Sequence, residues 1–313
     1  MKNHREVTDD RSPSGDEELR ERILAGVPVS SRRLEASGVS TMVLEAGDGP
    51  PMFLLHGGIE TGGVYWAPVI NQLAKQYQVI IPDSPGLGAS VRLARMDATA
   101  FTDWLAELIR QTCSEKPVLV AHSLNGSLAA RFAASHGDLL QRLVLSGVPG
   151  IGRYRPPLGF VVTAIRFSIR PTQKNNARFA EWAFLNTALT RSLDPGWYDA
   201  FMAYGLARGR VREVKRTMRQ LVKAGTKRIS EAELRKISIP ATLIWGRHDR
   251  MVPLRIADAL NAKLGWPLHV IEDAGHVPHI EQRDAFLRSL RTAISGGTVG
   301  GTSTGSRGGR SGR

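Results

Sequence analysis

The chain has 313 residues, of which 42% are hydrophobic, and a formal net charge of +13. This length and apolar content allow one large domain with an insertion and a sizeable core. No apolar run reaches the roughly 20 residues that a membrane-spanning helix needs. The charged N-terminus lacks the apolar centre of a secretory signal, and the single cysteine, Cys113, excludes an internal disulfide framework. Together these features favour a cytoplasmic protein.

The two ends of the chain differ in composition from the rest. Residues 1–19 are polar and charged, whereas residues 296–313 consist almost entirely of Gly, Ser, Thr and Arg. Compositions of this kind cannot bury a core, so we expect both ends to form disordered tails.

Between the tails, short apolar runs of strand type alternate with patterns of helical periodicity. The expected strands are residues 52–55, 79–81, 118–120, 143–145, 241–245 and 268–271. The expected helices are residues 66–75, 98–113, a segment that begins after 123, 254–264 and 281–294. This alternation predicts an α/β fold with a doubly wound, mainly parallel sheet, formed by residues 20–149 and 238–295.

The alternation stops in residues 150–237, which have helical patterns interrupted by prolines. We expect this segment to form a helical cap, or lid, inserted over the ends of the strands. Residues 151–240 contain 18 Lys and Arg but 6 Asp and Glu, a net charge of +12, so the cap carries nearly all of the excess charge. A solvated basic helix face would explain this charge, and so would attraction of an anionic substrate or weak peripheral contact with an anionic membrane. No nucleic-acid partner is expected, because no binding motif accompanies the charge.

One serine lies where an apolar strand pattern changes abruptly into a helical pattern. Ser123 follows the run at 118–122, and the helical pattern begins directly after it. Such a transition exposes the hydroxyl and directs backbone N–H groups toward the group that it attacks. A serine nucleophile also needs a base. Asp249 and His276 each follow a predicted parallel strand, so we expect all three side chains at the same edge of the sheet.

Four motifs of the chain resemble those of the α/β-hydrolase superfamily, each after its own predicted strand. They are residues 55–58 (LHGG), 83–90 (DSPGLGAS), 121–126 (AHSLNG), and 246–249 (GRHD) paired with 274–276 (AGH). The resemblance implies a triad of Ser123 as nucleophile, His276 as base and Asp249 as the acid that orients the base. It also implies an oxyanion hole formed by the backbone N–H groups of Gly58 and Leu124. No cofactor is implied, and no His/Glu spacing indicates a metal site.

Several residues near these motifs have competing interpretations. Asp273 is the alternative acid, and His279 is the alternative base, although we expect His279 on the surface at the start of the last helix. Asn125 occupies a position where the superfamily usually has Gly; Asn tolerates left-handed backbone geometry, so the turn can form with some crowding. By resemblance, Asp83 is a structural loop acid, and His56 and His122 order the loops around the serine.

The serine nucleophile predicts hydrolysis of a small or medium apolar ester, thioester or lactone through an acyl-enzyme. Carbon–carbon bond hydrolysis is an alternative, although enzymes of that kind usually have tryptophan after the catalytic histidine, where Val277 stands. The same motifs are compatible with cofactor-free haloperoxidase chemistry, with a ligand receptor that uses the same fold, and with a lipid hydrolase whose apolar segment 158–169 meets a membrane. The bulky side chains expected to line the pocket, or else to form the core of the cap, are Trp66, Phe160, Phe167, Trp182 and Phe184.

Overall fold

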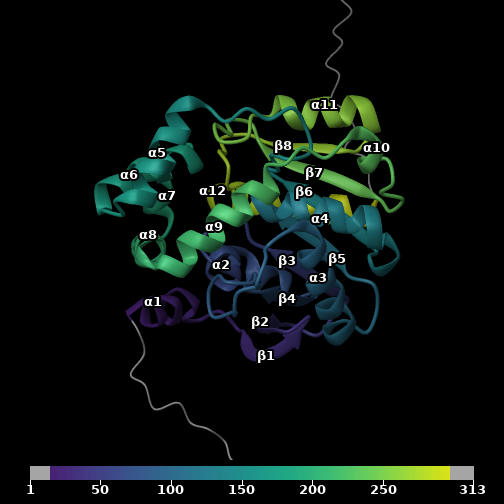
Figure 1. Ribbon diagram of the computed structural model, residues 1–313, viewed down its shortest axis with the longest axis horizontal. Helices are drawn as coiled ribbons and strands as arrows, with labels where there is room; N and C mark the ends of the chain where they lie inside the picture. The colour runs from purple at the N-terminus through teal and green to yellow at the C-terminus, as the bar shows by residue number, and fades with distance from the viewer. Residues whose placement is uncertain (1–14, 297–313) are drawn as a thin grey trace, which may run out of the picture.

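The computed structural model describes residues 15–296, which form an eight-stranded sheet with helices on both faces (Figure 1). The strand order is β1-β2-β4-β3-β5-β6-β7-β8. The strands are β1 (Ser30–Ala36), β2 (Val39–Ala46), β3 (Pro51–Leu55), β4 (Gln78–Pro82), β5 (Val118–His122), β6 (Arg142–Ser146), β7 (Ala241–Gly246) and β8 (Leu268–Ile271). Pairing is parallel from β4 to β8 and antiparallel at β1–β2 and β2–β4. The predicted α/β fold with a mainly parallel sheet is confirmed.

The antiparallel hairpin β1–β2 is the part of the sheet that the sequence pattern does not predict. β1 has the sequence SSRRLEA, and five of its seven residues are exposed. It is an edge strand, and edge strands are commonly polar and charged, so no apolar alternation reveals it. The central strands β3, β5 and β7 are buried along their whole length, as strands covered on both faces are.

Two layers of helices bury the sheet. The core on one face includes residues of α3 (Ala98–Thr112), α4 (Ser123–His136), α10 (Glu231–Leu234) and α11 (Arg255–Leu264). The core on the other face includes residues of α2 (Gly62–Leu73), α12 (Pro278–Glu281) and α13 (Arg283–Ser295). A short 3-10 helix, Gly137–Leu139, follows α4. None of the helices in residues 15–296 is long and apolar enough to cross a membrane.

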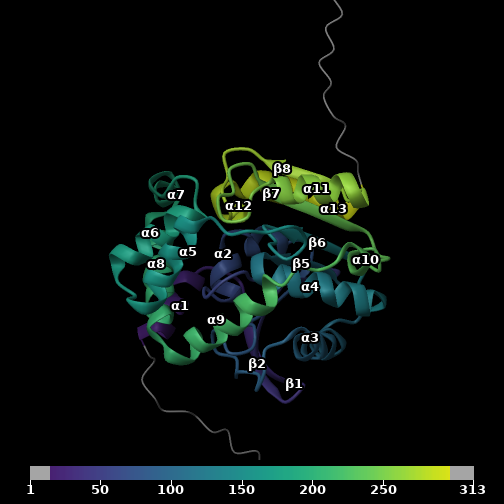
Figure 2. The same cartoon turned by 45° about the horizontal axis from the view of Figure 1, so that its top comes forward.

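The segment between β6 and β7 is helical. It contains α5 (Leu158–Ile169), α6 (Gln173–Ala183), α7 (Thr187–Leu193), α8 (Pro195–Arg210) and α9 (Arg212–Gly225) before α10. Helices α5 to α8 lie together at one edge of the molecule in both views, and α9 runs from them toward α4 (Figures 1 and 2). We refer to α5–α9 as the cap.

An N-terminal helix, α1 (Gly15–Leu24), packs against α8 of the cap. The prediction that the first 19 residues form a disordered tail is therefore wrong for residues 15–19. Acidic residues in the first turn and Arg22 in the last turn complement the helix dipole, and Ile23 is buried. The rest of the two predicted tails lies outside the described residues.

Candidate active site

Ser123 lies at a sharp junction between β5 and α4. The strand ends at His122, the helix begins at Ser123, and Ser123 has a left-handed φ of 52°. A left-handed conformation is costly for a residue other than glycine, and such strain is concentrated at functional sites. The junction also needs close approach, because a Cβ on Gly126 would lie 2.4 Å from Val148 Cγ2.

The structure brings Ser123, His276 and Asp249 together in one chain of hydrogen bonds. Ser123 Oγ lies 3.0 Å from His276 Nε2, and His276 Nδ1 lies 2.8 Å from Asp249 Oδ2. All three residues are buried. The second oxygen of Asp249 accepts hydrogen bonds from the backbone N–H groups of Met251 and Val252, at 2.9 and 2.7 Å. The carboxylate is therefore held in a fixed orientation toward the imidazole.

Neither alternative member of the triad occupies this position. Asp273 is exposed, with a left-handed φ of 51°. His279 is fully buried in α12, where its ring lies 4.7 Å from that of Tyr65 and 4.4 Å from that of Trp66. The prediction that His279 is a surface residue is therefore wrong. The short helix α12 turns inward and packs against α2, and this packing cannot be seen in the periodicity of the sequence.

His122 holds the backbone of His276 in place. Its Nε2 lies 2.7 Å from the carbonyl oxygen of His276, and its Nδ1 lies 2.7 Å from the hydroxyl of Tyr65. Because a carbonyl only accepts, the proton is on Nε2, and Nδ1 accepts from Tyr65. Burial, with a contribution from His276, lowers the pKa of His122 well below its ordinary value. His122 is thus a neutral donor that positions the loop of His276.

The loop after β3 lies directly against Ser123. A Cβ on Gly57 would come within 2.4 Å of His122 Nδ1 and 2.8 Å of Ser123 Cβ, so this position has room only for glycine. His56 Nε2 accepts from the N–H of Ser84 at 3.1 Å, which leaves the proton on Nδ1 to donate to the carbonyl of Gly58 at 3.1 Å. Burial lowers the pKa of His56 to about 4, which keeps this ring neutral.

The two residues that the resemblance implies as oxyanion donors lie in the loop and the helix next to Ser123. Gly58 lies in the loop after β3, and Leu124 is the second residue of α4, where N–H groups have no partner within the helix. A donor pair of this kind can stabilise the oxygen that becomes negative when a serine attacks a carbonyl.

Asn125 links the loops on either side of Ser123. The side chain is fully buried, and its Nδ2 donates to the carbonyl of His56 at 2.7 Å and to Ser84 Oγ at 2.8 Å. The left-handed residue of the turn is Ser123 and not Asn125, although Asn tolerates this geometry; Asn125 has an ordinary helical position in α4. Asn125 therefore ties the loop after β3 to the loop after β4, and glycine could not make either bond.

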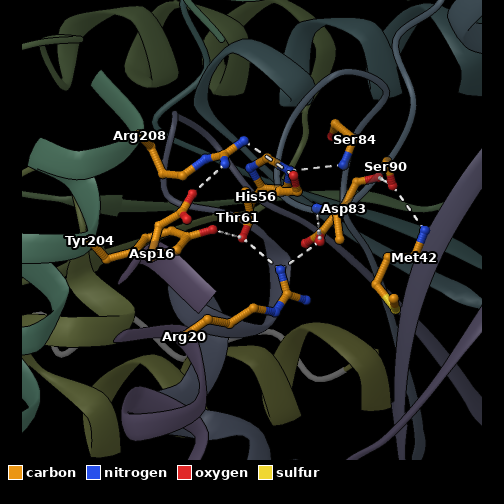
Figure 3. A network of polar contacts seen from close by, with 12 residues as sticks. Asp16, Arg20, Met42, His56, Thr61, Asp83, Ser84, Ser90, Tyr204 and Arg208 are labelled. Carbon is orange, nitrogen blue, oxygen red and sulfur yellow. Dashed lines mark hydrogen bonds and ion pairs between the residues drawn. The ribbon is translucent and has the colours of Figure 1, made fainter. Parts of the chain in front are cut away.

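A second polar network connects these loops to α1 and the cap (Figure 3). Asp83, which is fully buried, accepts from Arg20 Nη1 at 2.6 Å and from the N–H of Ala89 at 3.0 Å. Arg20 also donates to Thr61 Oγ1, which lies 2.9 Å from the hydroxyl of Tyr204 in α8. Asp83 thus has the structural position that the resemblance implies, and its cationic partner comes from α1.

The same network holds α8 again one helical turn after Tyr204. Arg208 donates to Asp16 in α1 at 2.6 Å and to the carbonyl of Gly88 at 3.1 Å (Figure 3). Residues 15–19, which sequence reasoning assigned to a tail, therefore help to hold the cap in place.

The cap also contacts the loops that carry Asp249 and His276. We call residues 183–185, at the end of α6, the docking segment. The carbonyl of Ala183 accepts a hydrogen bond from the N–H of His276 at 2.7 Å. Glu281 accepts from the N–H of Leu185 at 2.6 Å with one oxygen and from the N–H of Gly275 at 2.7 Å with the other. Arg250 donates to the carbonyl of Phe184 at 2.9 Å. The cap and the histidine loop are therefore joined by hydrogen bonds on both sides of His276.

Sequence reasoning missed two carboxyl groups of this site. Glu281 has a pKa of about 7, raised by burial against the opposing effect of its backbone donors. Glu60 lies in the loop after β3, and a Cβ on Gly58 would come within 2.9 Å of Glu60 Oε2. Burial raises the pKa of Glu60 as well. In the sequence both look like ordinary surface acids, and their nearness to known motifs is the only signal.

The bulky residues expected to line the pocket lie in two places. Trp66 is fully buried beneath the site, with its ring 4.4 Å from that of His279, so it is a core residue rather than a pocket wall. Phe160 and Phe167 pack on Phe179 of α6, at ring distances of 5.9 and 5.7 Å. Trp182 packs on Phe160, and Phe184 packs on Tyr198 and Phe201. These cap residues form the aromatic core of the cap, which was the alternative interpretation.

Within residues 15–296, no group of His, Cys, Asp or Glu side chains is arranged to hold a metal ion. Cys113 is half-buried, and burial raises the pKa of its thiol to about 11, so it is a poor nucleophile at neutral pH.

Comparison with known proteins decides the family. The model of the alpha/beta hydrolase family matches residues 52–289, which include every motif described above. The chain belongs to the α/β hydrolase family. Its relatives with a named activity are hydrolases and esterases, and the chain is an enzyme of the hydrolase class.

Three relatives illustrate the range of this α/β hydrolase's similarities. The 2-hydroxy-6-oxo-6-(2'-aminophenyl)hexa-2,4-dienoic acid hydrolase of Metapseudomonas resinovorans is 26% identical over 279 residues, 84% of this chain and 90% of the relative. The pimeloyl-[acyl-carrier protein] methyl ester esterase of Vibrio atlanticus is 27% identical over 263 residues, 78% of this chain and 94% of the relative. Carboxylesterase CesB from Bacillus subtilis superposes with a TM-score of 0.78 at 19% identity, covering 90% of this chain and 98% of CesB, and shows the shared fold.

Proposed function

We propose that this α/β hydrolase cleaves a carboxylic ester or thioester through an acyl-enzyme on Ser123. The observation that carries the proposal is the continuous hydrogen-bond chain from Ser123 Oγ through His276 to Asp249, at 3.0 and 2.8 Å. Ser123 Oγ attacks the carbonyl carbon while its proton passes to His276 Nε2. Asp249 keeps the other ring proton on Nδ1 and stabilises the imidazolium, and the N–H groups of Gly58 and Leu124 stabilise the oxyanion.

Collapse of the tetrahedral intermediate completes the first half of the reaction. The carbon–oxygen or carbon–sulfur bond breaks, and the leaving alcohol or thiol takes the proton from His276. A water molecule then attacks the acyl-enzyme, again with His276 as the base, and releases the acid and free Ser123.

The first test is covalent labelling with a fluorophosphonate, followed by intact mass. We expect one adduct on the wild-type protein, none on Ser123→Ala, and much slower labelling of His276→Ala. Ser135→Ala, which changes an exposed serine at the other end of α4, is the matched control and should label like wild type. A folded wild-type protein that takes no adduct would contradict the proposal and favour a ligand receptor on the same fold.

A basic cavity suggests which leaving groups the site accepts. It has a volume of about 410 Å³ and is lined by Gly152, Arg153, Tyr154, Arg155, Thr226 and Arg228. The three arginines are exposed, and none has an ion-pair partner among residues 15–296. Gly225, which precedes the lining residue Thr226, packs directly on Leu124 and so connects one wall of the cavity to the residue that follows the nucleophile. We therefore propose an anionic substrate, bound through its charged end.

Paired thioesters test this preference. Wild type should hydrolyse butyryl-coenzyme A with a kcat/KM about ten times that for butyryl-N-acetylcysteamine, which lacks the phosphates. The ratio should approach one in the triple variant Arg153→Gln, Arg155→Gln, Arg228→Gln. A control triple, Arg110→Gln, Arg288→Gln, Arg291→Gln, removes the same charge from α3 and α13 and should keep the wild-type ratio. Equal ratios in both triples would contradict a specific anion site.

Carbon–carbon bond hydrolysis is the second candidate, because the 26%-identical relative acts on a dienoic acid. Such a substrate is also anionic and would suit the same cavity. Assaying 2-hydroxy-6-oxo-6-phenylhexa-2,4-dienoate beside the thioesters separates the two activities. Turnover of the dienoate above that of every ester would favour this candidate.

A further inference from the structure

The cap exposes large apolar side chains on two of its helices, most of them on α5. Six of the nine large hydrophobic side chains that are exposed in residues 15–296 belong to α5 and α7: Leu158, Val162, Ile165, Ile169, Leu189 and Leu193. Single exposed apolar residues are normal, but a contiguous group marks an interaction site. Four of the six lie on α5 alone.

The four exposed residues of α5 form one stripe. Leu158, Val162, Ile165 and Ile169 are 78%, 38%, 52% and 76% exposed, and their spacing of 4, 3 and 4 residues confines them to about 60° of the helix circumference. The stripe runs about 17 Å along the axis. We call it the α5 stripe.

The opposite side of α5 is apolar as well. Phe167 is buried against Phe179 and Gly209, where a Cβ on the glycine would lie 2.7 Å from Phe167 Cζ. A helix that is apolar on all sides is normally buried on all sides. The inner side of α5 has its partners in the cap, whereas the α5 stripe stays exposed and is not covered by any residue of 15–296.

Charge identifies the partner. Arg166 and Arg170 lie beside the stripe, and Lys174 and Arg178 follow on α6; all four are exposed, and none has an ion-pair partner among the described residues. No Asp or Glu occurs in the sequence between Asp138 and Glu181. An apolar stripe whose neighbours in the sequence include four exposed cations and no acid fits an anionic lipid surface, because the head groups attract the cations while the stripe enters the acyl boundary. A second copy of the chain would bring the same cations together and be repelled.

We propose that the α5 stripe docks the enzyme on anionic membranes. The bound molecule lies on the bilayer without crossing it, with α5 in the plane of the interface. The aromatic core of the cap, on the inner side of the same helix, then separates the lipid surface from the candidate active site. Docking needs neither Ser123 nor turnover, so it stands independently of the proposed function.

Vesicle co-sedimentation of the full chain tests the docking. Wild type should bind vesicles of mixed phosphatidylcholine and phosphatidylglycerol, with salt weakening the binding, and bind pure phosphatidylcholine at least about tenfold less. The triple variant Leu158→Ser, Ile165→Ser, Ile169→Ser should lose about tenfold or more in partitioning to the mixed vesicles. The control triple, Val91→Ser, Val211→Ser, Val222→Ser, changes three valines that are exposed in the described structure and lie outside α5 and α7, and it should bind like wild type.

Two further readouts make each outcome decisive. Ser123→Ala should bind vesicles like wild type, so a failed triad leaves this test intact. Circular dichroism and fluorophosphonate labelling show whether the triple variant Leu158→Ser, Ile165→Ser, Ile169→Ser is folded. The proposal would be overturned if wild type did not bind the mixed vesicles, or if the α5 triple and the valine triple bound them equally. It would also be overturned by a wild-type dimer that only the α5 triple dissociates, because the stripe would then be a contact between two copies.

Discussion

Replacing Asp249 with asparagine should lower kcat on the best ester or thioester by about 10⁴-fold, with little change in KM. The reason lies in the two sets of hydrogen bonds that the carboxylate accepts. One oxygen of Asp249 is committed to the N–H groups of Met251 and Val252. An amide that keeps its oxygen there turns its NH₂ group toward His276 Nδ1. The imidazole must then accept at Nδ1 and carry its proton on Nε2, where it can no longer take the proton of Ser123.

Asp273→Asn is the matched control for this prediction. Asp273 is exposed, lies two residues before Gly275, and has a φ of 51° that asparagine also tolerates. Its kcat should stay within a few-fold of wild type. A large loss of kcat in Asp273→Asn together with a small loss in Asp249→Asn would mean that Asp273, and not Asp249, is the acid of the triad. Fluorophosphonate labelling of both variants gives the same comparison without a substrate.

The residues of the candidate triad could be named from the sequence because the motifs that contain them resemble those of the α/β-hydrolase superfamily, and each motif follows a predicted parallel strand. Such strands appear as apolar runs, and the loop that follows each run lies at the carboxyl edge of the sheet. Ser123, Asp249 and His276 all have this position, so the topology alone brings them near one another. The edge strand β1 has no apolar run and could not be found in this way.

The residues that support the triad could not be named, because their roles depend on long-range packing. His279 was expected on the surface, yet α12 turns it between Tyr65 and Trp66. Asn125 was expected to crowd the turn, yet its amide meets two acceptors in loops 41 and 69 residues away in the sequence. A charged residue near the start of a helix also predicts solvent exposure, which is wrong for Glu281. No local pattern distinguishes these residues from ordinary surface or core positions.

Two separate sets of contacts fix the loops around the candidate site. Arg20 and Arg208 join α1, the cap and the loop of Asp83, while the docking segment joins the cap to the loop of His276. Fixing the groups around a nucleophile in this way lowers the reorganisation needed during reaction. The cap is therefore part of the framework of the candidate site.

As the pH rises, wild type should lose stability against unfolding relative to the variant Glu281→Gln. The pKa of Glu281 is about 7 in the folded protein, against 4.5 for an ordinary glutamate, because burial opposes ionisation. Between these values the folded state keeps a proton that the unfolded chain releases, so rising pH favours unfolding. The difference in free energy of unfolding, wild type minus variant, should fall by about 3 kcal/mol from about pH 4.5 to pH 8. Urea unfolding at a series of pH values measures it.

Glu272→Gln provides the comparison, since Glu272 is exposed and its pairing with Arg247 lowers the pKa of its carboxyl. Its difference from wild type should stay constant above about pH 5, where this carboxyl is ionised in both states. A constant difference for Glu281→Gln over the same range would mean that the carboxylate is ionised throughout. The N–H groups of Leu185 and Gly275 would then outweigh burial, and the joint between the cap and the His276 loop would be insensitive to pH. The fall that we expect instead makes the folded protein less stable, through the cost of burying the ionised Glu281, in the pH range where a neutral imidazole can act as the base.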